Sequence, residues 1–248
     1  APRTTHYLTP TVSLQGPLEP AFVSLADGAR RSAWTAEELA DHRTAWLARM
    51  ANAPARGNRG LSPQAVVELA QQACRRSGAD PRIAVDAGAH MFPATTFWQA
   101  SRPGDLLISN GLSTMGFALP AGIAAALHDP QRGALAFTGD GGLLMALGEL
   151  ATAAALGAKL VVVVFNDATL SLIDIKRDAR SLPEGVLDGP LADFAGTMRA
   201  CGGLGLRAST EEEYAAALDR AFAASGPALI DVLVEPESYP AQIKALRG

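Results

Sequence analysis

The stretch that decides the fold runs from Phe137 to Asp167 and reads FTGDGGLLMALGELATAAALGAKLVVVVFND. It predicts a strand that ends in a Gly-Asp-Gly-Gly turn, a helix over 143–157, and a Val-rich strand that ends in Asn-Asp. The second strand is apolar on both faces, which is typical of a parallel sheet covered by helices. A helix between neighbouring parallel strands is a right-handed crossover, so both strands point the same way. Asp140 and Asp167 are therefore expected at one edge of the sheet, although 27 positions separate them (167 minus 140).

The residues at this edge predict a site for a diphosphate and a divalent cation. In open α/β sheets, ligands bind beyond the carboxyl ends of the strands. Carboxylate oxygens suit Mg²⁺, which also keeps bonds to phosphate oxygens or water. The glycines at 139, 141 and 142 let an anion approach the main chain, and the next helix turns its positive end toward that anion.

Two other interpretations of the glycine turn are weaker. Gly-Asp-Gly can be a plain strand-to-helix turn, but the Asn-Asp pair at the end of the next strand argues against that. A dinucleotide-binding fingerprint needs the pattern G-x-G-x-x-G. Here Asp140 would lie where the pyrophosphate presses against the turn, which is unfavourable without a metal between them.

The rest of the chain predicts a doubly wound parallel sheet with helices on both faces, because strands and helices alternate from Leu61 onward. Further helices are predicted at 62–76, 116–129 and 210–225, with Ser62 and Thr210 as N-caps. Further strands are predicted at 82–88, 105–111 and 227–235. Residues before 61 read differently: a helix over 35–50 opens with Thr35 and Glu38 as a capping box, and 51–60 resemble a linker.

Composition excludes several classes of protein. The net charge is −4 and no basic stripe carries interleaved aromatic residues, so we expect no nucleic-acid partner. No apolar run reaches the roughly 20 residues that span a bilayer, so we expect no membrane insertion. Cys74 and Cys201 lie far apart and lack the spacing of metal ligands, which predicts two reduced thiols in a cytoplasmic protein.

Three motifs in order resemble the thiamine diphosphate-dependent enzymes, in particular their acetolactate synthase-like branch. GDGG followed by FND resembles the metal and diphosphate motif of that family. ISNGLSTMGFALPAGIAAAL (108–127) resembles the segment before this motif, and VDAGAHMFPATTFWQ (85–99) resembles the cofactor loop one strand earlier. The resemblance covers residues 60–236. It implies that 1–60 are the end of a central domain plus a linker, and that 61–248 are the domain that binds the cofactor's diphosphate and Mg²⁺.

The resemblance also implies a role for each matching residue. Asp140, Asp167 and the main-chain carbonyl of Thr169 are expected to bind Mg²⁺. Asp167 stands where the family has an asparagine, and Asn166 would be the ligand if the register shifts by one residue. Met115 matches the apolar residue that wedges between the two rings of the cofactor, and His90 could donate to a phosphate. The expected cofactor-binding residues are Gly88, Ala89, His90, Ser113, Met115, Gly139, Asp140, Gly141, Gly142, Asp167, Thr169, Ser171 and Leu172.

The implied activity is decarboxylation of a 2-keto acid with carboligation. The family's catalytic glutamate lies on a pyrimidine-binding domain that these residues do not hold. We therefore expect the chain to be a cleaved piece or one chain of a split enzyme. We also expect a partner that carries the pyrimidine-binding domain, in a homo- or hetero-oligomer. FAD, which some members hold in the central domain, is not indicated.

Alternatives are a simple 2-keto acid decarboxylase or a non-catalytic cofactor-binding and assembly subunit. LIDIKRD, beginning at Leu172, lacks the tryptophan of authentic acetolactate synthases. Asp174, Lys176 and Arg177 are either surface charges on a helix or a means to steer an anionic substrate.

Overall fold

The computed structural model describes residues 12, 14–51, 60–178, 189 and 192–247. The described residues divide into two compact units, with the boundary between Leu47 and Ala48. The described helices nearest the N-terminus are α1 (Leu18–Ala26) and α2 (Ala36–Ala51). The capping box predicted for α2 is confirmed, because the Thr35 N–H donates to Glu38 Oε2 at 2.7 Å and the Glu38 N–H donates to Thr35 Oγ1 at 3.1 Å. Most of the predicted linker lies outside the described residues.

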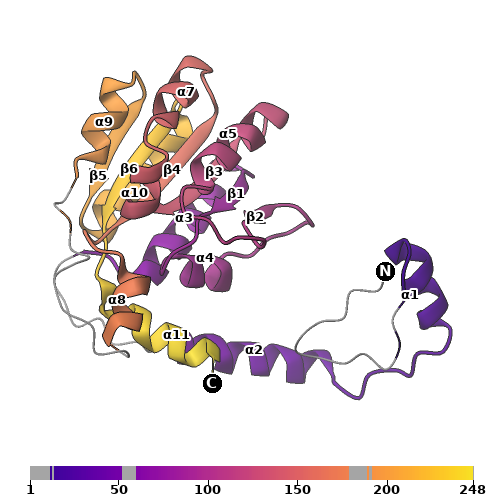
Figure 1. Cartoon of the computed structure of the whole chain (residues 1–248). Coiled ribbons are helices and arrows are strands. Elements are labelled where there is room, and N and C mark those ends of the chain that lie inside the picture. The colour runs from indigo at the N-terminus through magenta and orange to yellow at the C-terminus, as the bar shows by residue number, and fades with distance from the viewer. Residues whose placement is uncertain (1–11, 13, 52–59, 179–188, 190–191, 248) are drawn as a thin grey trace. The chain divides into compact units, whose positions relative to one another are not determined.

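The larger unit is built on a six-stranded sheet in the order β2-β1-β3-β4-β6-β5, and every neighbouring pair is parallel (Figure 1). The strands are β1 (Arg82–Val85), β2 (Leu106–Ile108), β3 (Ala134–Gly139), β4 (Leu160–Asn166), β5 (Leu204–Ala208) and β6 (Ala228–Leu233). The order reverses direction between β1 and β3, because the chain leaves β1 for β2 on one side and continues from β3 to β4 on the other. The predicted doubly wound fold is confirmed.

Helices cover both faces of this sheet (Figure 1). The helices of this unit are α3 (Pro63–Ser77), α4 (Met91–Phe97), α5 (Ala118–His128), α6 (Asp140–Met145), α7 (Glu149–Ala155), α8 (Ser171–Asp178), α9 (Phe194–Ala200), α10 (Glu211–Ala223), the short 3₁₀-helix η1 (Pro236–Ser238) and α11 (Tyr239–Arg247). Side chains of α5, α7 and α9 share one apolar cluster with alternate residues of β1, β3, β4 and β6. Helix α3 contacts both α4 and α10 on the other face. Among the described residues, no helix has the length and apolar character to cross a membrane.

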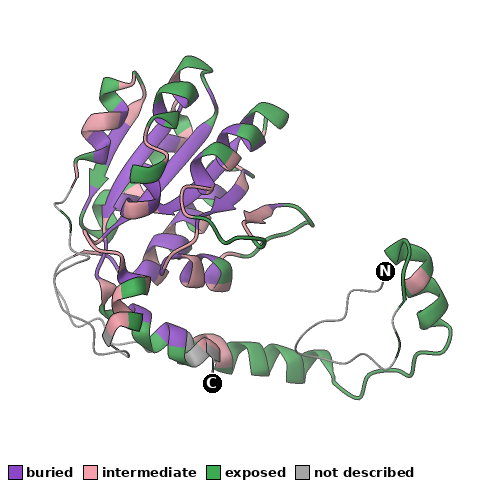
Figure 2. Ribbon diagram, viewed as in Figure 1, coloured by how far each residue is buried: buried purple, intermediate pink, exposed green. Residues whose placement is uncertain are grey.

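The central strands form the core (Figure 2). Every residue of β4 is buried, as the Val-rich sequence predicts for a strand covered on both faces. Because successive side chains of a strand point to opposite faces, Val162 and Val164 join the cluster with α5, α7 and α9, whereas Val161 and Val163 face away from it. Ser62 and Thr210 cap α3 and α10 as predicted, since each side chain accepts an N–H from the first turn of its helix.

The structure corrects the predicted elements in two places. The single helix predicted over 143–157 is two helices, α6 and α7, with residues 146–148 between them. Gly148, between the two helices, is a poor helix former. Because α6 already begins at Asp140, the positive helix end that was predicted to face the anion belongs to a helix of six residues. Strand β5 and helices α4, α9 and α11 were not predicted. Strand β5 follows Gly202 and Gly203 and contains Gly205, a composition that is unfavourable for strands.

Candidate functional site

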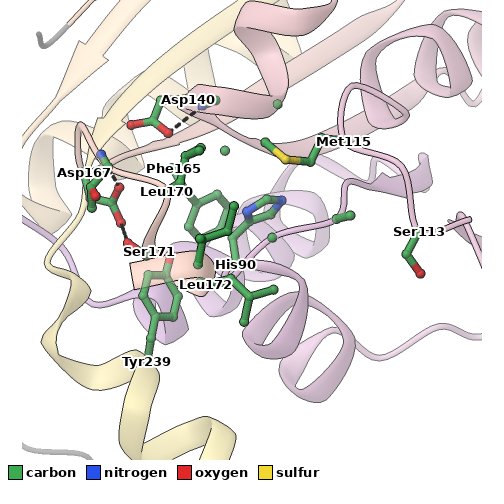
Figure 3. Close-up of a pocket in the computed structure, with 18 residues that line it drawn as sticks. His90, Ser113, Met115, Asp140, Phe165, Asp167, Leu170, Ser171, Leu172 and Tyr239 are labelled. Carbon is green, nitrogen blue, oxygen red and sulfur yellow. Dashed lines mark hydrogen bonds between the residues drawn. The ribbon is translucent and has the colours of Figure 1, made fainter. Parts of the chain in front are cut away.

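A cavity of about 190 Å³ opens at the carboxyl ends of β1, β3 and β4 (Figure 3). This is the point where the strand order reverses, and ligands bind at that point in open α/β sheets. Every residue predicted to bind the cofactor lines the cavity: Gly88, Ala89, His90, Ser113, Met115, Gly139, Asp140, Gly141, Gly142, Asp167, Thr169, Ser171 and Leu172. Their proximity is observed, and their binding roles stay predictions.

Asp140 places a buried carboxylate at the start of α6. Its Oδ1 accepts the Gly141 N–H at 2.6 Å. Its Oδ2 is buried and has no hydrogen-bond partner within the described part of the chain. Burial raises the pKa of this carboxyl above its ordinary value, although the N–H groups of Gly141, Ala168 and Asp167 oppose that shift. An unpartnered buried carboxylate oxygen is costly unless something binds it.

Asp167 lies directly after β4 and faces the same cavity (Figure 3). Its Oδ1 accepts the Thr169 N–H at 3.1 Å, and its Oδ2 accepts the Ser171 hydroxyl at 2.5 Å. Burial raises the pKa of Asp167 to about 7, the Ser171 hydrogen bond opposes this, and the negative charge of Asp140 adds to it. The pKa values of both neighbouring carboxyl groups are raised, so their ionised forms are disfavoured in the absence of a cation. A bound cation would stabilise the two negative charges.

The donor set fits Mg²⁺ held partly by a ligand. The described residues contain no group of three or more His, Cys, Asp or Glu side chains that could hold a metal ion. Side chains at this site therefore supply two carboxylates, and main-chain carbonyls, water or phosphate must supply the other oxygens. Mg²⁺ is bound in this way at phosphate sites. The residues present thus fit the predicted metal and diphosphate.

Asn166, the alternative ligand, points away from the cavity. Its Nδ2 donates to Asp231 Oδ1 at 2.8 Å, and both side chains are almost fully buried. The reason is the alternation of strand residues, because Asn166 shares the face of Val164 and Asp167 turns to the opposite one. The geometry favours Asp167 over Asn166 as the metal ligand.

The glycines of the turn are needed for space. A Cβ on Gly139 would lie 3.1 Å from His90 Nδ1, and one on Gly142 would lie 2.5 Å from Asp86 Oδ2. A Cβ on Gly141 would overlap the Leu170 side chain and lie 3.3 Å from Met115 Cε. Side chains at these positions would therefore crowd the cavity wall, as expected for a turn that a bulky anion approaches.

His90 presents an acceptor to the cavity. The residue precedes α4, is 4% exposed, and its ring centroid lies 5.4 Å from that of Phe165. Burial lowers the pKa of His90 to about 3, although a hydrogen bond with the Asp86 carbonyl opposes this, so the ring is neutral. Nε2 has no partner among the described residues. A neutral ring has a single N–H, and when this N–H donates a hydrogen bond to the Asp86 carbonyl, Nε2 is left as an acceptor. The predicted donation from His90 to a phosphate would need the other tautomer of the ring, and it stays a prediction.

The cavity wall also includes residues that sequence reasoning missed. They are Ala87, Phe165, Leu170, Ile173 and Tyr239. Phe165 precedes Asn-Asp on β4, so the alternation of the strand could have identified it. Tyr239 begins α11, 72 positions after Asp167 (239 minus 167), and no sequence pattern links the two.

The charges of α8 pair with each other. Arg177 Nε donates to Asp174 Oδ1 at 2.7 Å, as expected for residues three positions apart on a helix. Lys176 is exposed on the same helix. Asp174 therefore offsets the charge of Arg177. For Arg177 and Asp174, this favours surface charges on a helix over the steering of an anionic substrate.

Comparison with known proteins agrees with this site. Residues 86–232 match the family described as thiamine pyrophosphate enzyme, C-terminal TPP binding domain. The chain is 34% identical over 163 residues to the acetolactate synthase isozyme 1 large subunit of Escherichia coli, a match that covers 64% of this chain and 29% of that protein. It is 32% identical over 162 residues to the acetolactate synthase of Bacillus subtilis, covering 64% of this chain and 28% of that protein.

A solved structure shares the fold. The thiamine diphosphate-dependent 4-hydroxybenzoylformate decarboxylase of Rhodococcus jostii RHA1 matches with a TM-score of 0.64 at 25% identity, over 71% of this chain and 33% of that chain. The chain spans less than a third of the length of the two acetolactate synthases.

Proposed function

Because the chain belongs to the thiamine pyrophosphate enzyme family, in its acetolactate synthase-like branch, we propose that it binds thiamine diphosphate through Mg²⁺ and takes part in decarboxylation of a 2-keto acid followed by carboligation. The observation that carries this proposal is the pair of carboxylates, the buried Asp140 and the partly buried Asp167, beside a glycine turn at the strand-order reversal. The unpartnered Oδ2 of Asp140 supports a cation at that position.

Each part of the site has a task in this proposal. Asp140, Asp167 and the Thr169 carbonyl hold Mg²⁺, and the main chain of Gly141 and Gly142 admits the diphosphate. Met115 supports the cofactor from the side of the exposed segment before α5. When bound, thiamine diphosphate supplies the electron sink that decarboxylation of a 2-keto acid requires.

The apolar wall contributes by excluding water. Phe165, Leu170, Leu172 and Ile173 line the cavity, and the neutral His90 adds no charge. A charged carboxylate of the substrate loses hydration in such surroundings, which favours its departure as neutral CO₂. His90 Nε2 can accept one hydrogen bond from a donor on a bound ligand.

We further propose that a pyrimidine-binding domain covers the mouth of the cavity, supplied by another part of the polypeptide or by another chain of a homo- or hetero-oligomer. The support is an apolar rim on the segments that supply the cavity wall: Leu112, Leu144, Met145 and Ile173 are 92%, 55%, 65% and 47% exposed. Gly116, next to Met115, lies against Met145, so the rim joins the cavity wall. Large exposed apolar side chains that gather beside a cavity mark an interaction surface. That domain would supply the catalytic glutamate.

A simple decarboxylase of the same fold is the second candidate. It is favoured by the absence of tryptophan from the LIDIKRD segment, and the Rhodococcus jostii protein with a similar fold is a decarboxylase. A non-catalytic assembly subunit is the third, and the intact carboxylate pair opposes it. Product analysis with 2-keto acids and the pyrimidine-binding domain separates carboligation from release of a free aldehyde.

The binding proposal is tested by titrating the chain with thiamine diphosphate, with and without Mg²⁺, in a calorimeter. We expect Mg²⁺-dependent binding, and we expect Asp140→Asn to weaken it at least 100-fold while the protein stays folded. Asp219→Asn is the matched control, because it makes the same chemical change at a carboxylate that is 59% exposed, pairs with Arg76 and does not line the cavity. Binding that ignores Mg²⁺, or that survives Asp140→Asn, would contradict the proposed metal site.

A further inference from the structure

Asp86 joins three segments of the cavity wall. It follows β1 directly, its side chain is fully buried, and the sequence motifs assigned it no role. Its Oδ1 accepts the N–H of Ala87 at 2.9 Å and that of Phe117 at 3.1 Å. Its Oδ2 accepts the Gly116 N–H at 3.0 Å and the Thr138 hydroxyl at 2.8 Å. The four donors match the four acceptor positions of one carboxylate.

The segment that carries Met115 depends on these bonds. Residues 110–114 are exposed, and Ser113 and Gly116 have left-handed backbone conformations with φ of 50° and 81°. Main-chain groups of Gly111–Phe117 donate two hydrogen bonds to Asp86. Within the described part of the chain, these are their only hydrogen bonds to residues outside this segment and the adjoining helix α5. Both come from the residues that directly follow Met115.

The glycine turn rests on the same carboxylate. A Cβ on Gly142 would lie 2.5 Å from Asp86 Oδ2 and 3.0 Å from Thr138 Oγ1, so the turn approaches Asp86 as closely as glycine permits. One buried side chain therefore fixes the distance between the segment of Met115, the loop after β1 and the turn after β3.

We propose that Asp86 is a positioning residue that holds Met115 against the cofactor cavity, through its hydrogen bonds to the Gly116 and Phe117 amides. The part that concerns the cofactor rests on the proposed function. An asparagine at this position has one acceptor oxygen and one NH₂ group, and the NH₂ would face at least one main-chain N–H. Thr138 can rotate its hydroxyl to accept from an amide, but the main-chain donors cannot.

The first test needs no cofactor. Amide hydrogen exchange of the unliganded chain should show Gly116 and Phe117 exchanging at least tenfold more slowly than Leu112 and Ser113, because charge-assisted bonds of this kind are worth that factor or more. Asp86→Asn should remove this protection, and the exchange rates of the β3 and β4 amides should stay within threefold of their wild-type values. Equal exchange along the wild-type segment would overturn the proposal without any variant, as would unchanged protection in Asp86→Asn.

Thr138→Val is the matched control. It removes one donor to the same oxygen and leaves both main-chain bonds, so we expect protection of Gly116 and Phe117 within threefold of wild type. If Thr138→Val exposes these amides as strongly as Asp86→Asn, the effect comes from general loosening of the buried site and the specific role of Asp86 is refuted.

The second test concerns the ligand. With Mg²⁺ present, Asp86→Asn should weaken the binding of thiamine diphosphate about tenfold. It should weaken the binding of inorganic pyrophosphate less than threefold, because only thiamine diphosphate has rings for Met115 to support. Met115→Ala should show the same selectivity, and the double variant should bind thiamine diphosphate no more weakly than Met115→Ala alone. Equal losses for both ligands, or additive losses, would overturn the role. Failure of the wild type to bind thiamine diphosphate would refute the proposed function, and the exchange rates would still decide whether Asp86 holds the segment.

Discussion

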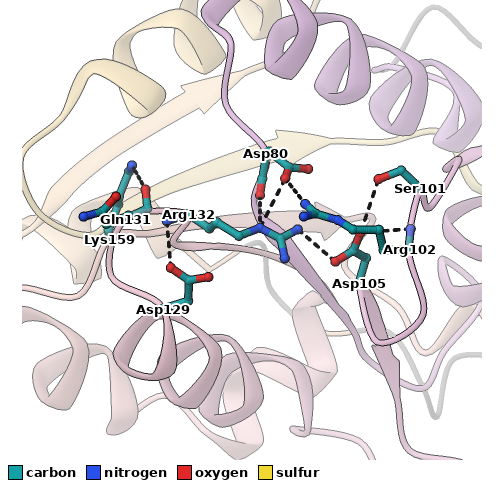
Figure 4. Close-up of polar contacts among 8 residues, drawn as sticks. All are labelled: Asp80, Ser101, Arg102, Asp105, Asp129, Gln131, Arg132 and Lys159. Atoms are coloured by element: carbon teal, nitrogen blue, oxygen red, sulfur yellow. Dashed lines mark hydrogen bonds and ion pairs between the residues drawn. The ribbon is translucent and has the colours of Figure 1, made fainter.

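Replacing Arg132 with methionine should destabilise the fold without touching the cavity. Arg132 precedes β3, at the edge of the sheet opposite the cavity, and joins Asp80 before β1 to Asp105 before β2 (Figure 4). Its Nη2 donates to Asp105 Oδ1 at 2.8 Å, and its Nε donates to the Asp80 carbonyl at 2.8 Å. Arg102 also pairs with Asp80 and Asp105. Methionine keeps most of the side-chain length and removes every donor.

The expected loss follows from burial. The side chains of Arg132 and Asp105 are 17% and 7% exposed, so their bond is that of a mostly buried charged pair. Hydrogen bonds that involve a charged group are worth about 1.5 kcal/mol or more each, so losing two gives about 3 kcal/mol. The contact with the Asp80 carboxylate, which is 55% exposed, adds little. For a unit of this size, we expect the melting temperature to fall by about 6–12 °C.

The loss should depend on pH. Burial alone would raise the pKa of Asp105, but the hydrogen bond and charge of Arg132 outweigh it and hold the pKa below its ordinary value. A carboxyl with a lowered folded-state pKa stabilises the protein above its unfolded-state pKa of about 4, and that contribution disappears as the pH falls through the folded-state value. The difference between wild type and Arg132→Met should therefore be full at pH 7 and shrink below about pH 4.

Thermal and urea unfolding at pH 7 and pH 3 measure this difference. Arg76→Met is the matched control, because Arg76 pairs with Asp219 at 2.9 Å while both side chains are about half exposed. That variant should lose less than about 1 kcal/mol. A loss below about 1 kcal/mol for Arg132→Met at pH 7, or an equal loss at both pH values, would refute the reasoning.

Three further outcomes are expected. Ser171→Ala should weaken Mg²⁺ binding by about 10–100-fold, measured by calorimetry, because it frees the Asp167 carboxylate to rotate; unchanged affinity would contradict this. Burial raises the pKa of Cys74 to about 12, so iodoacetamide at pH 8 should label the half-buried Cys201 first, and equal labelling by mass spectrometry would count against the buried thiol. Tyr214→Phe should leave unfolding free energy unchanged or raise it by about 1 kcal/mol, because the buried hydroxyl has no partner among the described residues; a loss above about 1 kcal/mol would mean that the hydroxyl is bonded.

The fold was predictable where hydrophobic pattern and capping residues agree. The Val-rich stretch of β4 could hardly be anything but a covered strand, and the caps at Ser62 and Thr210 define their helices. Strand β5 was missed because its glycines hide the pattern, and its place in the sheet depends on packing by α9 and α10. The break between α6 and α7 was missed because the alanine-rich sequence favours one helix, and tertiary packing overrides that preference.

The candidate site was predictable where its residues lie in local motifs at strand ends. Asp140 and Asp167 come together because parallel strands share an edge, a rule that needs no structure. Tyr239 could not be found this way, since it reaches the cavity from the far end of the chain. Asp86 gave a faint signal as an acid directly after a buried strand, but its four partners come from residues up to 52 positions away (138 minus 86).

The opposite orientations of Asn166 and Asp167 have a consequence for how such a chain can change over generations. A deletion of one codon within β4 would shift the following residues by one place and turn the amide into the cavity and the carboxylate toward Asp231. Exchange of one β-branched residue for another in the same strand would preserve both orientations. Sequence drift in β4 should therefore proceed through substitution at constant length, while gaps and insertions accumulate at positions such as the junction between α6 and α7.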